Sequence, residues 1–229
     1  MKKNIFCVAW IILCVCSISY AAPKKTVVWK SDFSQTAKSG EMTLPKGWEI
    51  SGTKSGVNKS FFNVVKADNG TNLLHMSSEK ARGGLLHKVK SVDLNKAPII
   101  RWKWKAIKLP EGGDGRFDEK GDQAIEIYVI SGGLLNQKCI VYTWETETPK
   151  NASKSFSIFM GAFKAKWFCV RNKTDKLNHW YIDERNVAED FKNTYGLIPD
   201  EVAVMPYCKS DMTQTSTEAE LAWIEFLKK

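Results

Sequence analysis

Five carboxylates and four glycines lie within residues 111–122, a segment that also contains Arg116 and Lys120. Calcium takes about six to eight oxygen ligands, which a flexible acidic loop can supply. The composition therefore suggests a calcium site formed by Asp114, Asp118 and Asp122. The spacing differs from that of an EF-hand, and the two cations would neutralise part of the acidic charge. A solvated turn between strands is the favoured alternative.

Two tryptophans, Trp102 and Trp104, alternate with basic residues in the run 99–107. Flat aromatic rings stack on sugar rings, but alternate tryptophans on a strand belong more often to the core, where we expect these two. Other aromatic residues are spaced less regularly and are candidates to line a cleft. We predict ligand-binding roles for four side chains, the last as an anion-binding group: Tyr142, Trp144, Trp180 and Arg185.

The same run predicts a basic face opposite the tryptophans, formed by Arg101, Lys103 and Lys105 and continued by Lys108. The formal net charge is +9 for the whole chain and +7 without residues 1–22, so this face would attract a polyanion such as an acidic polysaccharide or lipopolysaccharide. An ordinary charged solvent face is the favoured alternative. The sequence contains no motif of a nucleic-acid-binding fold, so no nucleic acid is expected as a partner.

A hydrolytic site would need two carboxylates across a cleft, and Glu126 and Glu145 are the one pair whose positions suggest it. For a lyase, the candidate residues are His179, Tyr142 and Arg185. The sequence contains no G-x-S-x-G elbow, P-loop or dinucleotide-binding fingerprint. The spacing of the three histidines is not that of a metal site. We assign no catalytic residue, and a binding protein is favoured over an enzyme.

Most of the chain has the pattern of strands separated by turns. Runs rich in β-branched and aromatic residues lie between Gly, Pro, Asn, Asp and Ser; they are 26–33, 61–65, 73–76, 84–92, 99–107, 124–130, 139–144, 166–170, 201–208 and 219–226. Because strands do not alternate with helices, a doubly wound sheet is not expected. The predicted fold is all-β: a two-sheet, jelly-roll-like sandwich, either concanavalin-like or carbohydrate-binding-module-like.

One segment, 183–195, has helical spacing of its apolar residues. The helix dipole disfavours a cation at a helix N-terminus, so we expect Arg185 to be held by an acid, either Asp190 or Asp211. The residues that can cap the helix are Asp183 or Asn186 at its start and Gly196 at its end.

The N-terminus predicts export. Lys2 and Lys3 precede an apolar run, 5–15, and small residues follow it at 19–22. The run is shorter than the roughly 20 residues that span a bilayer, so we interpret residues 1–22 as a cleavable signal peptide. Residues 23–229 are then expected to form one monomeric domain, periplasmic or secreted, with a net charge of +7 and no transmembrane segment.

Removal of residues 1–22 leaves three cysteines, Cys139, Cys169 and Cys208. In an oxidising compartment this odd number suggests one disulfide and one free thiol. Cys139 could then pair with Cys169 or with Cys208. Three buried thiols that behave as small apolar side chains are an equal alternative.

Six short motifs follow one another over most of the chain. They are 44–48 (LPKGW), 98–104 (PIIRWKW), 120–129 (KGDQAIEIYV), 142–144 (YTW), 185–199 (with Arg185, Asp190 and Pro199) and 210–213 (SDMT). In this order they resemble a bacterial family catalogued as domain of unknown function 3047. Gln123 and Glu126 depart from the pattern, which weakens the case for a shared acidic site. The resemblance implies an exported sandwich domain and supplies no catalytic residue.

The predicted function is binding of an extended ligand, with carbohydrate favoured. One alternative is a secreted or periplasmic glycoside hydrolase or polysaccharide lyase on the same scaffold. Another is an envelope interaction protein that binds no small ligand. Exposed Trp or Tyr side chains in a cleft would support binding, whereas two carboxyl groups roughly 5 to 9.5 Å apart would support hydrolysis.

Overall fold

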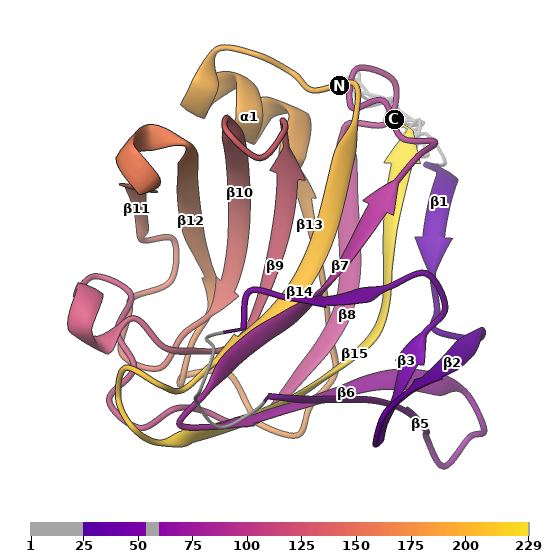
Figure 1. The fold of residues 1–229 in the computed structure, drawn as a ribbon, viewed down its shortest axis with the longest axis vertical. Helices are drawn as coiled ribbons and strands as arrows, with labels where there is room; N and C mark the ends of the chain where they lie inside the picture. Colours follow the sequence, from indigo (N-terminus) through magenta and orange to yellow (C-terminus); the bar gives the residue numbers. More distant parts are fainter. Residues whose placement is uncertain (1–24, 54–59, 229) are drawn as a thin grey trace, which may run out of the picture.

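Two β-sheets stack face to face in the computed structural model, which describes residues 25–53 and 60–228 (Figure 1). The architecture confirms the predicted all-β, jelly-roll-like sandwich. The predicted signal peptide, residues 1–22, lies outside the described residues. No helix in the described ranges is both long and apolar enough to cross a membrane.

The first sheet has seven strands in the order β11-β12-β10-β9-β14-β7-β4. Its members β10 and β12 are parallel neighbours, and the other neighbouring pairs are antiparallel. The strands are β4 (Glu49–Ser51), β7 (Arg82–Val89), β9 (Gln123–Ser131), β10 (Gln137–Trp144), β11 (Ser153–Ile158), β12 (Phe163–Arg171) and β14 (Val202–Lys209).

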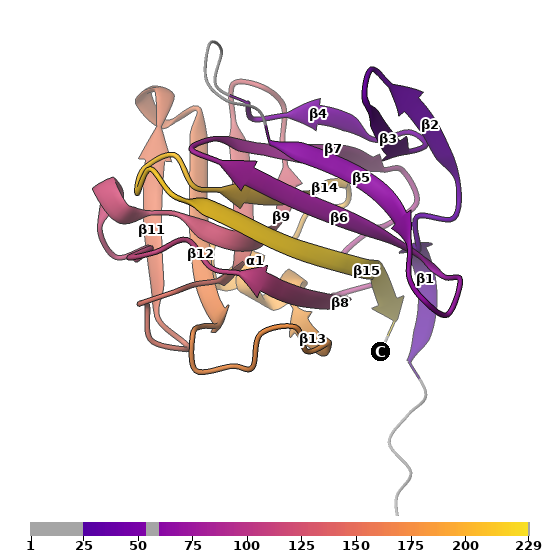
Figure 2. The same ribbon diagram turned by 90° about the horizontal axis from the view of Figure 1, so that it is seen from below.

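The second sheet has six strands in the order β13-β8-β15-β6-β5, and β1 pairs with β15. In Figure 2, β8, β15, β6 and β5 lie side by side across the molecule. The strands are β1 (Thr26–Ser31), β5 (Phe61–Lys66), β6 (Asn72–Glu79), β8 (Ile99–Lys108), β13 (Tyr181–Asn186) and β15 (Ser216–Lys228). A separate hairpin joins β2 (Thr36–Ser39) to β3 (Met42–Pro45).

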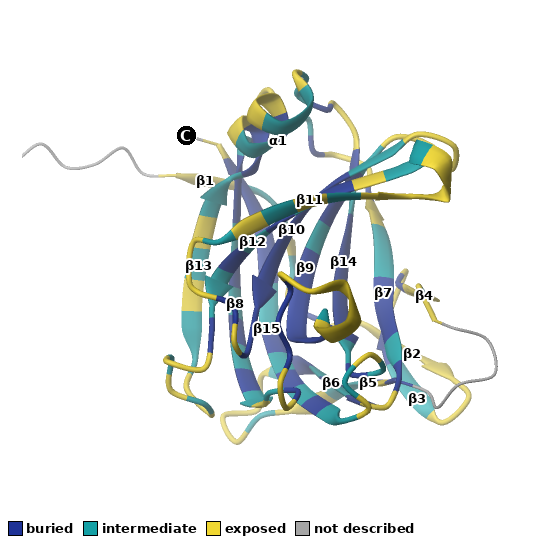
Figure 3. Ribbon diagram, turned by 90° about the vertical axis from the view of Figure 1, so that its left-hand side faces the viewer, coloured by how far each residue is buried: buried dark blue, intermediate teal, exposed yellow. Residues whose placement is uncertain are grey.

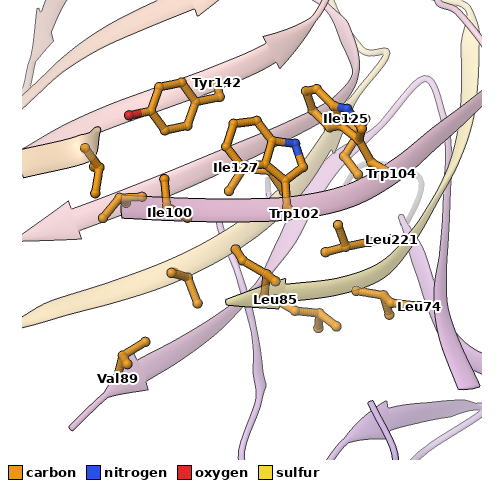
Figure 4. Packing of buried hydrophobic residues seen from close by; sticks show 14 of the residues in the cluster. Leu74, Leu85, Val89, Ile100, Trp102, Trp104, Ile125, Ile127, Tyr142 and Leu221 are labelled. Atoms are coloured by element: carbon orange, nitrogen blue, oxygen red, sulfur yellow. The ribbon is translucent and has the colours of Figure 1, made fainter. Parts of the chain in front are cut away.

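The core lies between the two sheets, where β8 faces β10 (Figure 4). Trp102 and Trp104 are fully buried there, as the alternation of apolar and basic residues predicts. The Trp102 ring stacks on Tyr142 with centroids 5.1 Å apart, and Trp104 meets Trp144 edge to face at 5.5 Å. These large rings fill the centre of the sandwich, which explains why the tryptophans alternate on one strand.

One α-helix, α1 (Val187–Tyr195), closes an end of the core with Val187, Ala188 and Phe191. Asn186 caps its start by accepting a hydrogen bond from the Glu189 N–H, and Gly196 ends it in the left-handed conformation. The helix therefore begins later than the predicted 183–195. Residues 183–186 instead belong to β13, because they pair with β8.

Ten predicted strands correspond to strands of the structure, and five further strands were not predicted: β2, β3, β4, β11 and β13. All five have six residues or fewer, and they lie at sheet edges or in the separate hairpin. Edge strands bury little apolar surface, so their sequences lack the alternation that identifies a strand. Two 3₁₀ turns, η1 (Asp118–Lys120) and η2 (Phe159–Gly161), complete the described elements.

The three described cysteines are buried and unpaired with one another. Cys139 lies opposite Ala165 in the β10–β12 register, four residues before Cys169. At roughly 3.3 Å per residue, this places the two cysteines about 13 Å apart along the strands, beyond the reach of a disulfide. The structure therefore favours the alternative in which all three cysteines are buried free thiols.

We expect these thiols to resist alkylation in the folded protein. Burial raises the pKa of Cys139, Cys169 and Cys208 to about 12 each, and the thiolate is the reactive form. Mass spectrometry after iodoacetamide treatment at pH 8 should show no label on these cysteines in buffer and a label on all three in denaturant. Rapid labelling in buffer, or a pair that needs reductant before it reacts, would contradict this arrangement.

Candidate functional site

The seven-stranded sheet has one face in the core and another turned away from it, which we call the outer face (Figure 3). Successive side chains of a strand point to opposite faces. In β9, Ile125, Ile127 and Val129 pack in the core, whereas Glu126 and Tyr128 lie on the outer face. A strand whose sequence is almost entirely apolar thus carries a polar and aromatic pair on its outer side.

Strand register arranges the outer-face side chains in two rows that cross β12, β10, β9 and β14. The first row consists of Trp167, Val141, Tyr128 and Met205. The second row consists of Cys169, Thr143, Glu126 and Tyr207. The rings of Tyr128 and Tyr207 meet edge to face, 5.6 Å between centroids, and so connect the two rows.

Glu126 is the buried carboxylate at the centre of these rows. Burial raises the pKa of the Glu126 carboxyl to about 7, although the charge of Lys209 and the interaction with Tyr128 oppose the shift. Burial also raises the pKa of Tyr207, so its phenol stays neutral and can donate a hydrogen bond at any physiological pH. A carboxylate that titrates near neutrality beside two tyrosines is typical of a functional site.

Glu145, the other carboxylate of the pair considered for hydrolysis, extends beyond the end of β10 and is fully buried. Its Oε2 accepts a hydrogen bond from the Gly115 N–H at 3.1 Å and lies 3.0 Å from the Thr148 hydroxyl. The Gln123 amide donates to Oε1 at 3.2 Å. Burial raises the pKa of Glu145, and these donors stabilise its charged form. Glu145 therefore anchors the 111–122 loop to the sheet.

Two segments cover parts of the outer face. The Tyr207 hydroxyl donates to the Gly52 carbonyl at 2.9 Å, and a Cβ atom at Gly52 would lie only 2.6 Å from the tyrosine ring. On the opposite side, a Cβ atom at Gly115 would lie 3.2 Å from Trp167. Trp167 and Tyr207 are consequently 6% and 7% exposed, whereas Tyr128 between them is half-buried and more accessible.

The three aspartates predicted to bind calcium each have a separate partner. Asp114 forms an ion pair with Arg116 at 2.6 Å, and this hydrogen bond lowers the pKa of the carboxyl. Asp118 pairs with Lys154 at 2.6 Å, while Asp122 accepts hydrogen bonds from Thr213. Within residues 25–53 and 60–228, no group of three or more His, Cys, Asp or Glu could hold a metal ion. The arrangement gives the calcium hypothesis no supporting geometry.

Two of the predicted ligand-binding residues, Tyr142 and Trp144, are fully buried between the sheets. They follow the same alternation as Ile140, which directs all three side chains into the core. Neither ring offers a face to a ligand in this structure. The strand was predicted correctly, but its sequence does not reveal which face is covered.

The other two predicted ligand-binding residues lie apart from the outer face. Arg185 pairs with Asp190 at 3.0 Å, and Asp190 also accepts a hydrogen bond from the Tyr142 hydroxyl at 2.7 Å. Asp190 is therefore the acid that holds Arg185, one of the two candidates considered. Trp180 is half-buried near the six-stranded sheet, with Lys105 Nζ 4.9 Å from its ring centroid.

Two of the four cations of the predicted basic face of β8 are neutralised by β15. Arg101 donates to Glu225 through Nε at 2.7 Å, and Lys105 pairs with Glu220 at 2.6 Å. These acids are the register partners of the two cations, so the strand pairing places opposite charges directly across from each other. The mixed charge favours the solvated-face alternative over polyanion binding.

Sequence reasoning did not identify Tyr128, Tyr207 or Trp167 as candidate site residues. One usable signal was the alternation in 123–131, which places Glu126 and Tyr128 on one face of the strand and Ile125 and Ile127 on the other. No sequence signal joins Tyr207 to this pair, because β14 and β9 are about 80 residues apart and meet only through sheet pairing.

Comparisons with known proteins identify a family. A family model described as "Protein of unknown function (DUF3047)" matches residues 46–225. No curated protein matches the chain.

Among solved structures, a family 11 carbohydrate-binding module of a cellulosomal cellulase from Clostridium thermocellum aligns with a TM-score of 0.47 at 10% identity, covering 91% of this chain and 97% of the module. A module described as mannan-recognising (TmCBM27) gives a TM-score of 0.37 at 13% identity, covering 90% of this chain and 99% of the module. A module described as specific for non-crystalline cellulose (CBM28) gives a TM-score of 0.38 at 14% identity, covering 90% of this chain and 93% of the module.

Proposed function

Because this chain belongs to the DUF3047 family of proteins of unknown function, we propose its function from its own site: it is an exported, non-catalytic domain that binds a carbohydrate chain on the outer face. The observation that carries the proposal is the placement of Tyr128 beside Glu126 on a sheet face that the second sheet does not cover. The predicted periplasmic or secreted location is part of the proposal.

The chemistry of the outer face suits a sugar. A sugar ring presents C–H groups on its faces and hydroxyl groups at its edge. The exposed part of the Tyr128 ring supplies an apolar surface for the former, and the Glu126 carboxylate, buried beside it and 4% exposed, is the nearest charged acceptor for one of the latter. Lys209, whose charge lowers the pKa of Glu126, adds a donor nearby. Apolar surface with a few placed polar groups is the usual composition of a ligand site.

The dimensions of the rows favour an extended ligand. From β12 to β14 each row crosses three inter-strand spacings, or about 14 Å at roughly 4.8 Å per spacing. This length exceeds one sugar ring, but every side chain of the two rows except Tyr128 is buried, so a short oligosaccharide would lie over Tyr128 and over the segments that cover the rest of the rows.

Hydrolysis is the second candidate, and one observation favours it. Glu126 lies opposite Thr143, and Glu145 follows Thr143 by two residues. Glu126 and Glu145 are therefore diagonal neighbours on one sheet face, with their Cα atoms roughly 7–8 Å apart. Inverting glycosidases hold their two carboxyl groups about 6.5–9.5 Å apart, so neighbours on one sheet face are close enough to be tested as such a pair. However, the hydrogen bonds from Gly115, Thr148 and Gln123 fix Glu145 beneath the loop. We therefore favour binding.

A glycan array on the purified protein, with calcium or with chelator, tests the proposal. We expect binding to at least one polysaccharide fragment and no release of reducing ends from it. Reducing ends that disappear in Glu126→Gln would establish hydrolysis instead. An array without binding would overturn the proposal and favour an envelope interaction protein that binds no small ligand.

The Tyr128→Ala variant should weaken binding of the array hit by about fivefold, because stacking on the exposed part of a half-buried ring should stabilise the complex by about 1 kcal/mol. Tyr128→Phe should lose less, since the ring remains. Trp180→Ala near the other sheet is the matched control and should bind normally in calorimetry. If Trp180→Ala binds weakly while Tyr128→Ala does not, the site lies elsewhere.

A further inference from the structure

Two hairpin turns with large apolar side chains lie side by side at one end of the seven-stranded sheet. One joins β9 to β10 and the other joins β11 to β12; both are at the top of Figure 1 and remain adjacent in Figure 2. The Gln137 N–H donates to the Ala162 carbonyl at 2.7 Å, which ties the turns together. We call the four residues at their tips, Leu134, Leu135, Phe159 and Met160, the apolar tips.

The apolar tips are unusually exposed. Leu134 and Leu135 are 86% and 84% exposed, Phe159 is 77% exposed, and Met160 is completely exposed. Ile158, beside them in the chain, is also exposed. Scattered apolar residues on a surface are ordinary, but adjacent ones on two neighbouring turns form a patch, and such patches mark interaction sites.

The turn geometry makes these residue types unexpected. In the first turn, the Asn136 N–H donates to the Gly133 carbonyl at 2.9 Å, which places Leu134 and Leu135 at the two central positions. In the second, the Ala162 N–H donates to the Phe159 carbonyl, with Met160 at φ 55° and Gly161 at φ 91°. This is the backbone of a type I′ turn, whose first central position favours Asn, Asp or Gly. An apolar side chain at Met160 therefore costs stability and needs another explanation, whereas Leu134 and Leu135 are unexpected only for their exposure.

The two hairpins that carry the tips are basic. Residues 127–144 and 148–174, which contain both hairpins, include no Asp or Glu. Lys138 and Lys164 are direct partners in the β10–β12 register, although like charges opposite each other are unfavourable. Among the described residues, neither lysine forms an ion pair, and the same holds for Lys166. The two hairpins thus have uncompensated positive charge of their own, and the exposed acids nearest to them in the register are Asp200 and Glu201, just before β14.

We infer that the apolar tips dock the protein on an anionic phospholipid bilayer. Projecting turns with exposed Leu, Phe and Met side chains can enter the fluid headgroup region, whereas a rigid protein partner is better matched by a flat surface. Lysines behind the tips would then meet the negatively charged headgroups. The inference does not depend on carbohydrate binding, since the Glu126 rows lie nearer the middle of the same strands.

Vesicle co-sedimentation of the purified protein tests this inference. We expect binding to vesicles of equal parts phosphatidylglycerol and phosphatidylcholine, weaker binding at high salt, and little binding to phosphatidylcholine alone. Absence of binding to the anionic vesicles would overturn the inference.

Variants assign the binding to the tips. Met160→Asn combined with Leu134→Ser and Leu135→Ser should weaken vesicle affinity at least about tenfold, because apolar insertion is lost. Asn suits the type I′ position, so the fold should be retained. Lys138→Gln with Lys164→Gln should cost about fivefold per lysine at low salt. Ile182→Ser, an exposed apolar residue on β13, and Lys173→Gln, at the opposite end of β12, are the matched controls and should bind normally.

Two results would contradict membrane docking even if the wild-type protein binds vesicles. The first is unchanged affinity in the triple tip variant. The second is a wild-type dimer in sedimentation velocity without vesicles that the tip variant dissociates, because the tips would then form an interface between two copies of the chain.

Discussion

Replacement of Trp104 by alanine is expected to lower the free energy of unfolding by about 4 kcal/mol, the typical cost of truncating a buried tryptophan. The side chain is fully buried and touches Trp102 and Trp144 edge to face, with centroids 5.3 and 5.5 Å away. Its indole Nε1–H also donates to Asp183 Oδ2 at 2.6 Å, which connects β8 to β13. Loss of the ring would leave a cavity that these large neighbours cannot fill.

Urea denaturation at neutral pH measures the effect, and Trp180→Ala provides the control. Trp180 is half-buried and contacts Lys103 and Lys105, so its loss should cost about 1 kcal/mol or less. Trp104→Phe should be intermediate, because most of the ring volume remains. A larger loss for Trp180→Ala than for Trp104→Ala would mean that the tryptophans of β8 are not the centre of the core.

Replacement of Glu126 by glutamine is expected to stabilise the protein at pH 8 by on the order of 3 kcal/mol, while near pH 4.5 the two proteins should have similar stability. Burial raises the pKa of Glu126 from 4.5 to about 7 in the folded state. Between these values the folded state binds more protons than the unfolded state, so wild-type stability falls as pH rises. The magnitude follows from about 2.5 pKa units at roughly 1.36 kcal/mol each.

Denaturant unfolding of both proteins from about pH 3 to pH 8 measures this difference and also covers the acid range in which the control below changes. Glu220→Gln serves as a control of opposite sign, because hydrogen bonds from His75 and Lys105 lower the pKa of Glu220. Its stabilising contribution is present at neutral pH and is lost as pH falls, so Glu220→Gln should be destabilised at pH 8 and approach wild type in acid. A pH-independent difference between Glu126→Gln and wild type would show that Glu126 has an ordinary pKa.

The stability penalty of Glu126 is also an argument about function. A buried carboxylate that weakens the fold at neutral pH is not explained by packing, since glutamine has nearly the same shape. Residues of this kind are retained where their chemistry is used. If Glu126→Gln is more stable and binds the glycan less well, then the buried charge of Glu126 both lowers the stability of the fold and contributes to binding.

The sequence by itself determined the fold class and the central strands. Period-two alternation in 99–107 predicts both the strand and the burial of Trp102 and Trp104, because each face of a strand meets a single environment. The helix end at Gly196 is similarly local, since only a residue that accepts positive φ fits there. Such features depend on neighbours in the chain, and neighbours are visible in a sequence.

Only the tertiary structure decided which faces and which partners matter. Tyr142 and Tyr128 both lie on central strands, but one is in the core and the other on the outer face. The carboxylates of the 111–122 loop have partners as far away as Thr213, so their spacing could not show whether they converge. Glu126, Tyr207 and Trp167 meet through pairings between strands distant in sequence. The order of strands in a sheet sets these contacts, and local sequence does not encode that order.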